Sequence, residues 1–435
     1  MLIHLICYTV GKIEVITQNI FENEKGIYRL ANKLHIKTKP FVIYNTIPIR
    51  EGSKISDTSI ISEIKSKLYS MRIFYSVDIK SEIRGDTIDL KIITKDLWTL
   101  GIYTNLEGSE RDRRIDIGFS DLNLLGLGTY FLSSGFISPD GSGFYGEFNT
   151  SSIIRQISFG INTKLTNYEK DFFFYSSRAS WSNIKSFSYF FWISKDSYKE
   201  KSSDIVGLNV GYNIKEPRNE PFIGFRIYNY KKGTGIIGYK FSNVKYAFLK
   251  NINSFSRDEM FKYGFDNYVA FGYGFFNLNT SYGFVFKNLT SVLNSEFENN
   301  PNYSYITLSN AIYYKITDFI TIAGYLYLGN MNIKDTTSAV GFRVGGLIGI
   351  RGVNYFEGFS NEIYRFSLEI RTYSKEIFSL IALGPIAFYD FAYYGKNISV
   401  YGIGMRFQIT RVSVPVIRID YANNGIISFS SGQAF

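Results

Sequence analysis

The sequence predicts a mainly β protein in which a large antiparallel transmembrane β-barrel follows a small α+β unit. Aromatic residues make up 18% of the chain, and the mean hydropathy is −0.05. Both values are typical of strands whose side chains alternate between lipid and a polar lumen. No run of about 18 strongly apolar residues occurs, so the sequence predicts no membrane-spanning helix. A soluble all-β protein is the structural alternative.

Charge and cysteine content exclude several functions. The net charge is +10, but Lys and Arg are spread along the chain without a basic block. We therefore expect no nucleic-acid partner, and we assign these charges to loops that face anionic lipid or solvent. Cys7 is the single cysteine, which rules out an intramolecular disulfide and a cysteine-based metal site. It lies in an apolar run, so we interpret residues 1–10 as a remnant of a signal peptide whose start is truncated or misassigned.

Residues 11–96 predict the α+β unit. Residues 12–17 alternate like a strand, and a short helix is expected over residues 41–48. The intervening segment 22–39 is long enough for an extra helix. Asp57 or Thr58 can then cap a helix. Four apolar residues share one face of that helix: Ile60, Ile61, Ile64 and Leu68.

A hairpin completes the unit, with strands at residues 75–79 and 87–92 around Arg84-Gly85-Asp86. The resulting order is β-α-α-β-β. This order, with IPIREGSKIS at residues 47–56 and LYSMRIFYSVDIK at residues 68–80, resembles a POTRA domain.

Residues 97–435 predict strands throughout. Along residues 401–409, large apolar side chains alternate with Gly402, Gly404, Arg406 and Gln408. One such face suits lipid and the other suits a polar lumen, whereas a soluble sandwich would bury these charges at a cost. Residues 315–318 and 410–413 predict short turns, and residues 250–263 and 296–302 predict longer exposed loops.

The central motif is an Arg-Gly pair in a glycine-rich segment, Gly345 to Val353. Two amphipathic strands follow, and they carry Glu369 and the sequence Phe388-Tyr389-Asp390. This arrangement resembles the signature of the BamA/TamA-type outer-membrane superfamily, whose barrels are bacterial surface antigen-like. The resemblance implies that the Arg351-Gly352 loop folds into the lumen, where Arg351 pairs with Glu369 and Asp390 beside Phe388. It also decides the number of strands, which we predict to be 16.

Two positions depart from the family pattern. Val353 stands where an aromatic residue is usual, and Tyr355 or Phe356 would have to replace it. Ala392 stands where glycine is usual. A solvated loop cation is the alternative interpretation of Arg351.

Further segments resemble the family in the same order. Residues 121–128 resemble its early-barrel element, with Asn123, Gly126 and Gly128 at the matching positions. Residues 95–99 resemble the junction between the domain and the barrel. The ending Phe429 to Phe435 resembles the last strand of outer-membrane barrels. Weak strand formers on the first and last strands predict a poorly paired seam: Gly101, Asn105 and Gly432.

Catalysis is not expected. The histidines are His4 and His35, both before the barrel, so a serine or aspartate partnered by a barrel histidine cannot form. No nucleotide, zinc or calcium motif occurs, and we expect no cofactor and no metal.

The family resemblance implies two possible functions in the bacterial outer membrane, with the POTRA domain in the periplasm. One is an assembly and insertion factor that templates unfolded outer-membrane clients at the seam, aided by periplasmic lipoproteins or chaperones. The other is a conduit, either a polypeptide-secreting pore or a passive channel. The discriminating feature is the pairing between residues 97–107 and 425–435.

Overall fold

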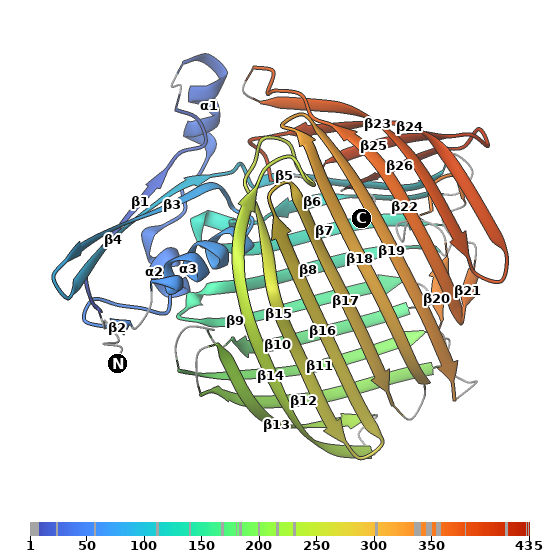
Figure 1. Ribbon diagram of the computed structural model, residues 1–435, viewed down its shortest axis with the longest axis horizontal. Coiled ribbons are helices and arrows are strands. Elements are labelled where there is room, and N and C mark those ends of the chain that lie inside the picture. The colour runs from blue at the N-terminus through green and yellow to red at the C-terminus, as the bar shows by residue number, and fades with distance from the viewer. Residues whose placement is uncertain are drawn as a thin grey trace.

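The structure of the protein is a computed structural model with two parts, a small N-terminal unit and a large barrel (Figure 1). It describes residues 8–22, 25–55, 58–109, 113–138, 141–166, 169–179, 181, 185–198, 201–214, 217–228, 232–300, 303–334, 341–344, 350–353, 358–378, 380–413, 416–431, 433 and 435.

The N-terminal unit is a four-stranded sheet covered by helices. The sheet order is β2-β1-β4-β3, with β1 and β4 parallel in the centre. The predicted hairpin is β3–β4, and the extra helix expected between residues 22 and 39 is α1. The elements are β1 (Tyr8–Gln18), α1 (Gly26–Leu34), α2 (Pro40–Thr46), β2 (Lys54–Ile55), α3 (Ser59–Ser70), β3 (Phe74–Arg84) and β4 (Thr87–Asp96).

Helix α3 holds the core of this unit. Ile60, Ile64 and Leu68 recur at helical spacing and are fully buried, as the sequence predicts, whereas Ile61 is only partly buried. They pack on the inward residues of β1 and β4, including Val10 and Ile88. Helix α2 starts at Pro40, where the missing N–H and fixed φ of proline suit a first helical turn.

The second part is a closed antiparallel barrel, as predicted. Its ring runs from β5 through β19, continues through β22 to β26, and closes between β26 and β5. The barrel strands are β5 (Leu100–Ser109), β6 (Arg113–Asp121), β7 (Thr129–Ser138), β8 (Gly141–Ile154), β9 (Ile157–Thr166), β10 (Glu169–Arg178), β11 (Ser186–Tyr198), β12 (Lys201–Asn213), β13 (Arg218–Tyr228), β14 (Lys232–Leu249), β15 (Glu259–Gly272), β16 (Phe275–Phe286), β17 (Leu289–Asn299), β18 (Tyr303–Thr317), β19 (Ile320–Ile333), β22 (Glu362–Thr372), β23 (Ile381–Tyr393), β24 (Asn397–Ile409), β25 (Ile417–Ala422) and β26 (Ile427–Ser431). A short 3-10 turn η1 (Leu124–Gly126) follows β6, and a separate two-stranded ribbon, β20 (Phe342–Val344) and β21 (Gly358–Ser360), lies between β19 and β22.

The predicted count of 16 strands is wrong, because the described residues form a ring of twenty. Many connections are shorter than expected, so the same length of chain holds more strands. Two residues join β8 to β9, β16 to β17 and β18 to β19, a connection length common in hairpins. The loop predicted at residues 296–302 is likewise short, because β17 continues to Asn299.

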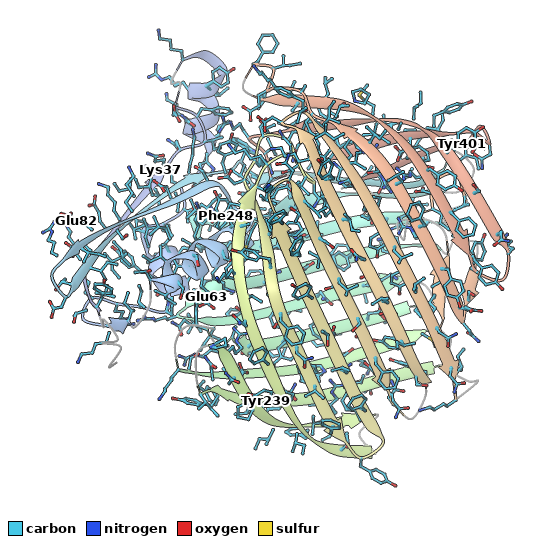
Figure 2. All side chains as sticks on the ribbon, in the orientation of Figure 1. Lys37, Glu63, Glu82, Tyr239, Phe248 and Tyr401 are labelled. Carbon is cyan, nitrogen blue, oxygen red and sulfur yellow. The ribbon has the colours of Figure 1, made fainter. Side chains whose placement is uncertain are left out.

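The barrel has an apolar outside and a polar inside. Tyr401 and Ile403 on β24 are 60% and 65% exposed, and Tyr401 lies on the outer surface in Figure 2, whereas Arg406 of the same strand is 1% exposed. Exposed apolar and buried charged residues on one strand invert the pattern of a soluble protein, so the outer face is suited to lipid. No helix in the described ranges is long and apolar enough to cross a membrane.

The N-terminal unit covers one end of the barrel (Figure 1). At the β14–β15 hairpin, Tyr69 donates a hydrogen bond to Asp258 at 3.1 Å, and its ring lies 5.1 Å from that of Phe248. Burial raises the pKa of the Tyr69 hydroxyl, so it stays protonated. Other contacts are made with the connections β6–β7, β8–β9, β22–β23 and β24–β25.

The early-barrel motif fixes the unit to the barrel. The Asn123 side chain donates to Thr38 Oγ1 at 2.9 Å and accepts from the Gly128 N–H at 2.7 Å. Thr38 in turn bonds to the fully buried Asp96, the last residue of β4. Gly126 accepts a hydrogen bond from the Lys39 N–H at 3.0 Å. This buried polar chain explains why Asn and Gly occupy the motif.

We predict that Gly126→Ala loosens the N-terminal unit from the barrel. The φ of Gly126 is +73°, and an added Cβ would meet the Lys37 carbonyl oxygen at 2.4 Å. Limited proteolysis should cleave between residues 30 and 40 faster than in the wild type, while the barrel keeps its heat-modifiable mobility on gels. Gly324→Ala is the matched control, because open space surrounds that position. Equal protection in both variants would contradict the prediction.

Candidate functional site: an arginine–carboxylate network inside the barrel

Arg351 lies inside the barrel and is 2% exposed. Its Nε and Nη2 donate to the two oxygens of Asp390 at 2.7 and 2.6 Å, and its Nη1 donates to Glu369. The guanidinium also stacks on Phe388 at 3.8 Å from the ring centroid. The structure thus brings together Arg351, Glu369, Phe388 and Asp390, and the solvated-cation alternative is excluded by the burial of the guanidinium.

Gly352 ties the same loop to the last two strands. Its N–H donates to Ser428 Oγ at 3.3 Å on β26, and its carbonyl accepts from Asn424 at 2.6 Å. With φ at +72°, an added Cβ would also lie 2.8 Å from Ala422, so only glycine fits here. Val353 packs in a buried apolar cluster with Phe388. Residues 345–349 of the motif, and Tyr355 and Phe356, lie outside the described residues.

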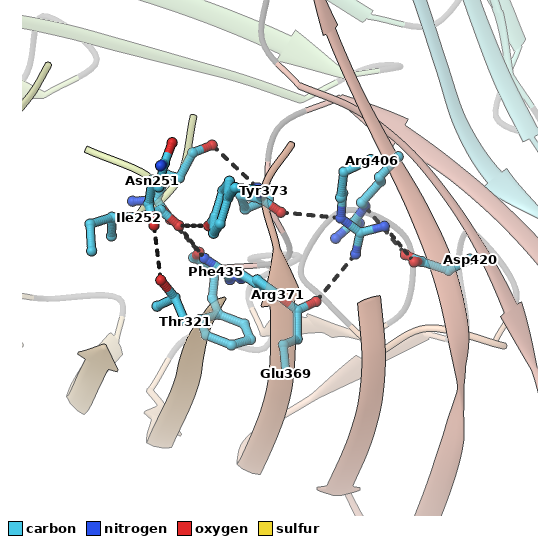
Figure 3. Close-up of polar contacts among 12 residues, drawn as sticks. Asn251, Ile252, Thr321, Glu369, Arg371, Tyr373, Arg406, Asp420 and Phe435 are labelled. Carbon is cyan, nitrogen blue, oxygen red and sulfur yellow. Dashed lines mark hydrogen bonds and ion pairs between the residues drawn. The ribbon is translucent and has the colours of Figure 1, made fainter. Parts of the chain in front are cut away.

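Glu369 is the centre of a larger network that sequence reasoning did not identify. Besides Arg351, it accepts from Arg371 Nε at 2.6 Å and from Arg406 Nη2 at 3.3 Å. Arg406 also donates to Asp420 at 2.7 Å, as Figure 3 shows. Each of these side chains is at most 2% exposed. The alternation of apolar and charged residues along β22, β24 and β25 could have revealed this network, because it places the charged side chains of all three strands on the lumen face.

A second segment enters the barrel from the end covered by the N-terminal unit. Residues 250–258, which connect β14 to β15, were expected to be an exposed loop, and that expectation is wrong. The Ile252 carbonyl accepts from Arg371 Nη1 at 2.9 Å, and Asn251 accepts from Thr321 at 3.0 Å (Figure 3). Glu259 accepts the backbone N–H groups of residues 252–254 at 2.9 to 3.0 Å. These bonds satisfy a turn that would otherwise leave polar backbone groups unpaired.

We expected Phe435 to belong to the last strand, but it does not. β26 ends at Ser431, and the Phe435 ring lies inside the barrel, stacked on Tyr325 at 5.4 Å. The Arg371 guanidinium lies over the Phe435 ring, 4.8 Å from its centroid. The Gln433 side chain donates to the Asn253 carbonyl at 3.3 Å. The aromatic and cationic partners inside the lumen therefore hold the segment off the wall.

Among the described residues, the seam between the first and last strands pairs over a short stretch. β26 and β5 share two register pairs, Ser428 with Ser109 and Phe429 with Gly108, whereas β5 and β6 share nine. Gly101 and Asn105 lie on the part of β5 that has no described partner on β26. Gly432 lies outside the described residues. Among the described residues no cluster of His, Cys, Asp and Glu could hold a metal ion.

We predict that Arg351→Ala destabilises the barrel while the N-terminal unit stays folded. Removing one member of a buried ion pair leaves the other charge uncompensated and costs about 3–5 kcal/mol. The measurement is the temperature at which the barrel loses its heat-modifiable gel mobility. Lys262→Ala is the control, because Lys262 pairs with Asp266 on an exposed site. An unchanged transition temperature in Arg351→Ala would refute the role of the loop as an interior lock.

We also predict that Arg371→Met releases residues 250–258 and 433–435. The substitution removes the hydrogen bonds to Ile252 and Asn253 and the cation over Phe435, while methionine keeps much of the side-chain volume. Amide hydrogen exchange should accelerate in residues 251–255 but not in β16. Unchanged exchange in residues 251–255 would show that the remaining bonds, such as those to Glu259 and Thr321, hold the segment without Arg371.

Comparison with solved structures shows the fold alone. Neither a protein-family model nor a curated protein matches the chain. CdiB from Acinetobacter baumannii is similar with a TM-score of 0.51 at 10% identity, over 98% of this chain and 74% of that one. CdiB from Escherichia coli has a TM-score of 0.50 at 10% identity, over 97% and 76%. BamA from Haemophilus ducreyi lacking POTRA domains 1–3 has a TM-score of 0.39 at 14% identity, over 98% and 84%. The chain therefore shares the fold of the two CdiB structures.

Proposed function

We propose that this protein is an assembly and insertion factor for outer-membrane β-barrel proteins, acting at the seam between β5 and β26. The observation that carries the proposal is the two-pair seam in a ring whose other neighbouring strands pair over longer stretches. In lipid every unpaired backbone group raises the free energy of the folded barrel. We therefore infer that the weak pairing is retained because the seam opens in function. An opened seam offers two strand edges on which a client strand can form.

The covered end and the occupied interior of the barrel support assembly over a passive channel. The N-terminal unit covers one end, and residues 250–258 and the Arg351 loop lie in the interior. These segments narrow the path that a solute would take, whereas a client strand added at the seam does not pass through the lumen. The proposal needs no catalytic residue, cofactor or metal.

The proposed orientation places the N-terminal unit in the periplasm as a POTRA domain. Its strand β3 is the edge of the sheet, and the residues at its tip are exposed. An exposed edge can bind an extended segment by strand addition. We therefore propose unfolded outer-membrane clients as the principal partners, with periplasmic lipoproteins or chaperones as accessory partners and outer-membrane lipid around the barrel.

A polypeptide-secreting pore is the second candidate, because two CdiB structures share the fold. Depletion of the protein distinguishes the two functions. An assembly factor should lower the levels of many outer-membrane proteins, whereas a secretion pore should affect one exported protein.

We predict that a disulfide across the seam blocks assembly without unfolding the barrel. Gly108→Cys with Phe429→Cys joins two register partners, in a Cys7→Ser background that leaves no other thiol. Insertion of a radiolabelled client barrel into proteoliposomes should stop under oxidation and return after reduction, because the strand edges cannot separate while linked.

The matched control is Thr280→Cys with Ser295→Cys, which links β16 to β17 in the middle of a long ladder. This cross-link should leave insertion unchanged. Full insertion with the seam shown by mass spectrometry to be cross-linked would contradict the assembly function and favour the conduit.

A further inference from the structure

A hollow in the barrel wall lies apart from the arginine network. It has a volume of about 390 Å³ and is bounded by β16 to β19 and by Phe342 of β20. The residues that line it alternate with outward residues such as Leu293, Ile306 and Leu326, which are exposed on the lipid face. The hollow therefore opens to the lumen. Its lining residues are Asn279, Asn294, Ser295, Glu296, Tyr305, Thr307, Ser309, Tyr327, Met331 and Phe342.

Strand register explains why the wall is hollow there. Thr307 on β18 lies opposite Gly329 on β19 and opposite Glu296 on β17. The small residues Thr307 and Gly329 thus occupy the middle of this part of the wall. The larger Tyr305 and Tyr327 lie two residues away on the same strands. Gly329 leaves room for the Phe342 ring, because an added Cβ would lie 2.8 Å from it.

Aromatic ring faces border the hollow in more than one direction. The rings of Tyr327 and Phe342 are 6.3 Å apart at an angle of 83°, so they form a corner. Tyr305 forms a third aromatic side and stacks with Tyr303 at 5.9 Å. Since the face of each ring is negative and its edge positive, a cation is attracted to the ring faces that this arrangement leaves open to the hollow.

The charge of this wall is also negative. Glu296 accepts a hydrogen bond from the Tyr305 hydroxyl at 2.7 Å, and Glu298 accepts from the amides of Asn277 and Asn300 at 3.1 and 2.9 Å. Within the described ranges no lysine or arginine forms an ion pair with either carboxylate. By contrast, β22 to β25 carry Arg365, Arg371, Arg406 and Arg418, and the inward loop adds Arg351. Of these, Arg365 lies opposite Tyr327 and over the Tyr325 ring.

We propose that this hollow is a binding site for an organic cation, an ammonium or guanidinium group, held over the rings of Tyr305, Tyr327 and Phe342 and neutralised by Glu296. The size of the hollow suits a small amine or one basic side chain. A neutral sugar would leave the carboxylate uncompensated, which carries a cost in a partly desolvated site. An anion would be repelled by Glu296. The site does not depend on the proposed assembly function, because no seam residue takes part in it.

The test is calorimetric titration of the full chain in detergent micelles with tetramethylammonium, spermidine, a lysine-containing tripeptide amide and the neutral sugar maltose. The cationic probes should bind and maltose should not. Glu296→Gln keeps an acceptor for Tyr305 but removes the charge, and Tyr327→Leu removes a ring face. Each variant should weaken cation binding by about tenfold or more.

Glu147→Gln is the matched control. Glu147 also faces the lumen with neutral donors, Tyr145 at 2.8 Å and Asn149 at 2.9 Å, but it lines no part of this hollow. It should leave the affinity unchanged, and heat-modifiable gel mobility should verify folding of all variants. Binding of the tripeptide alone would identify basic side chains of a polypeptide as the source, and binding of all three cations would extend the site to free amines.

Three results would overturn the inference. They are cation binding that is unchanged in Glu296→Gln, binding of maltose as tight as that of the cations, and absence of binding by every cationic probe.

Discussion

The interior of the barrel depends on the charge of Glu369. This carboxylate is fully buried and accepts from Arg351, Arg371 and Arg406, which come from the inward loop, β22 and β24. Ion pairs taken out of water are stabilising only when geometry and hydrogen bonding compensate for lost hydration. Here each arginine has further acceptors, in Asp390, the Ile252 carbonyl and Asp420. Loss of Glu369 would leave three neighbouring cations without their shared partner.

Through this carboxylate, segments that enter the barrel from opposite ends meet. The Arg351 loop follows β19, whereas residues 250–258 connect strands at the end covered by the N-terminal unit. Arg371 contacts both Ile252 and Glu369, and Glu369 accepts from Arg351, so Arg371 and Glu369 together link the two segments. The N-terminal unit extends the same set of contacts, because Tyr69 bonds to Asp258 beside the inward turn. A continuous series of contacts therefore links the domain, the lumen and the Arg351 loop.

The seam lies next to this network, and its weakness follows from the shortness of the last strand. β26 has five residues and ends at Ser431, and Phe435 lies in the lumen. The loop partly compensates, because Gly352 bonds to Ser428 and Asn424. The inward loop thus supports the same strand that pairs least with its neighbour. This placement couples the state of the lumen to the edge where we propose that clients enter.

The sequence by itself determined the barrel class and the elements of the N-terminal unit except β2, and the family resemblance supplied the partners of Arg351. Three local patterns recur in the structure. They are the period-two alternation, the helical spacing of Ile60, Ile64 and Leu68, and the Arg-Gly motif. Each one places side chains on a face that the fold buries. The number of strands, the inward course of residues 250–258, the position of Phe435 and the cluster around Glu369 were decided by the tertiary structure. These features depend on ring closure and on which distant side chains face one another across the lumen. Local spacing shows that a residue such as Arg371 points inward, but only the closed ring brings Ile252 and Phe435 to it.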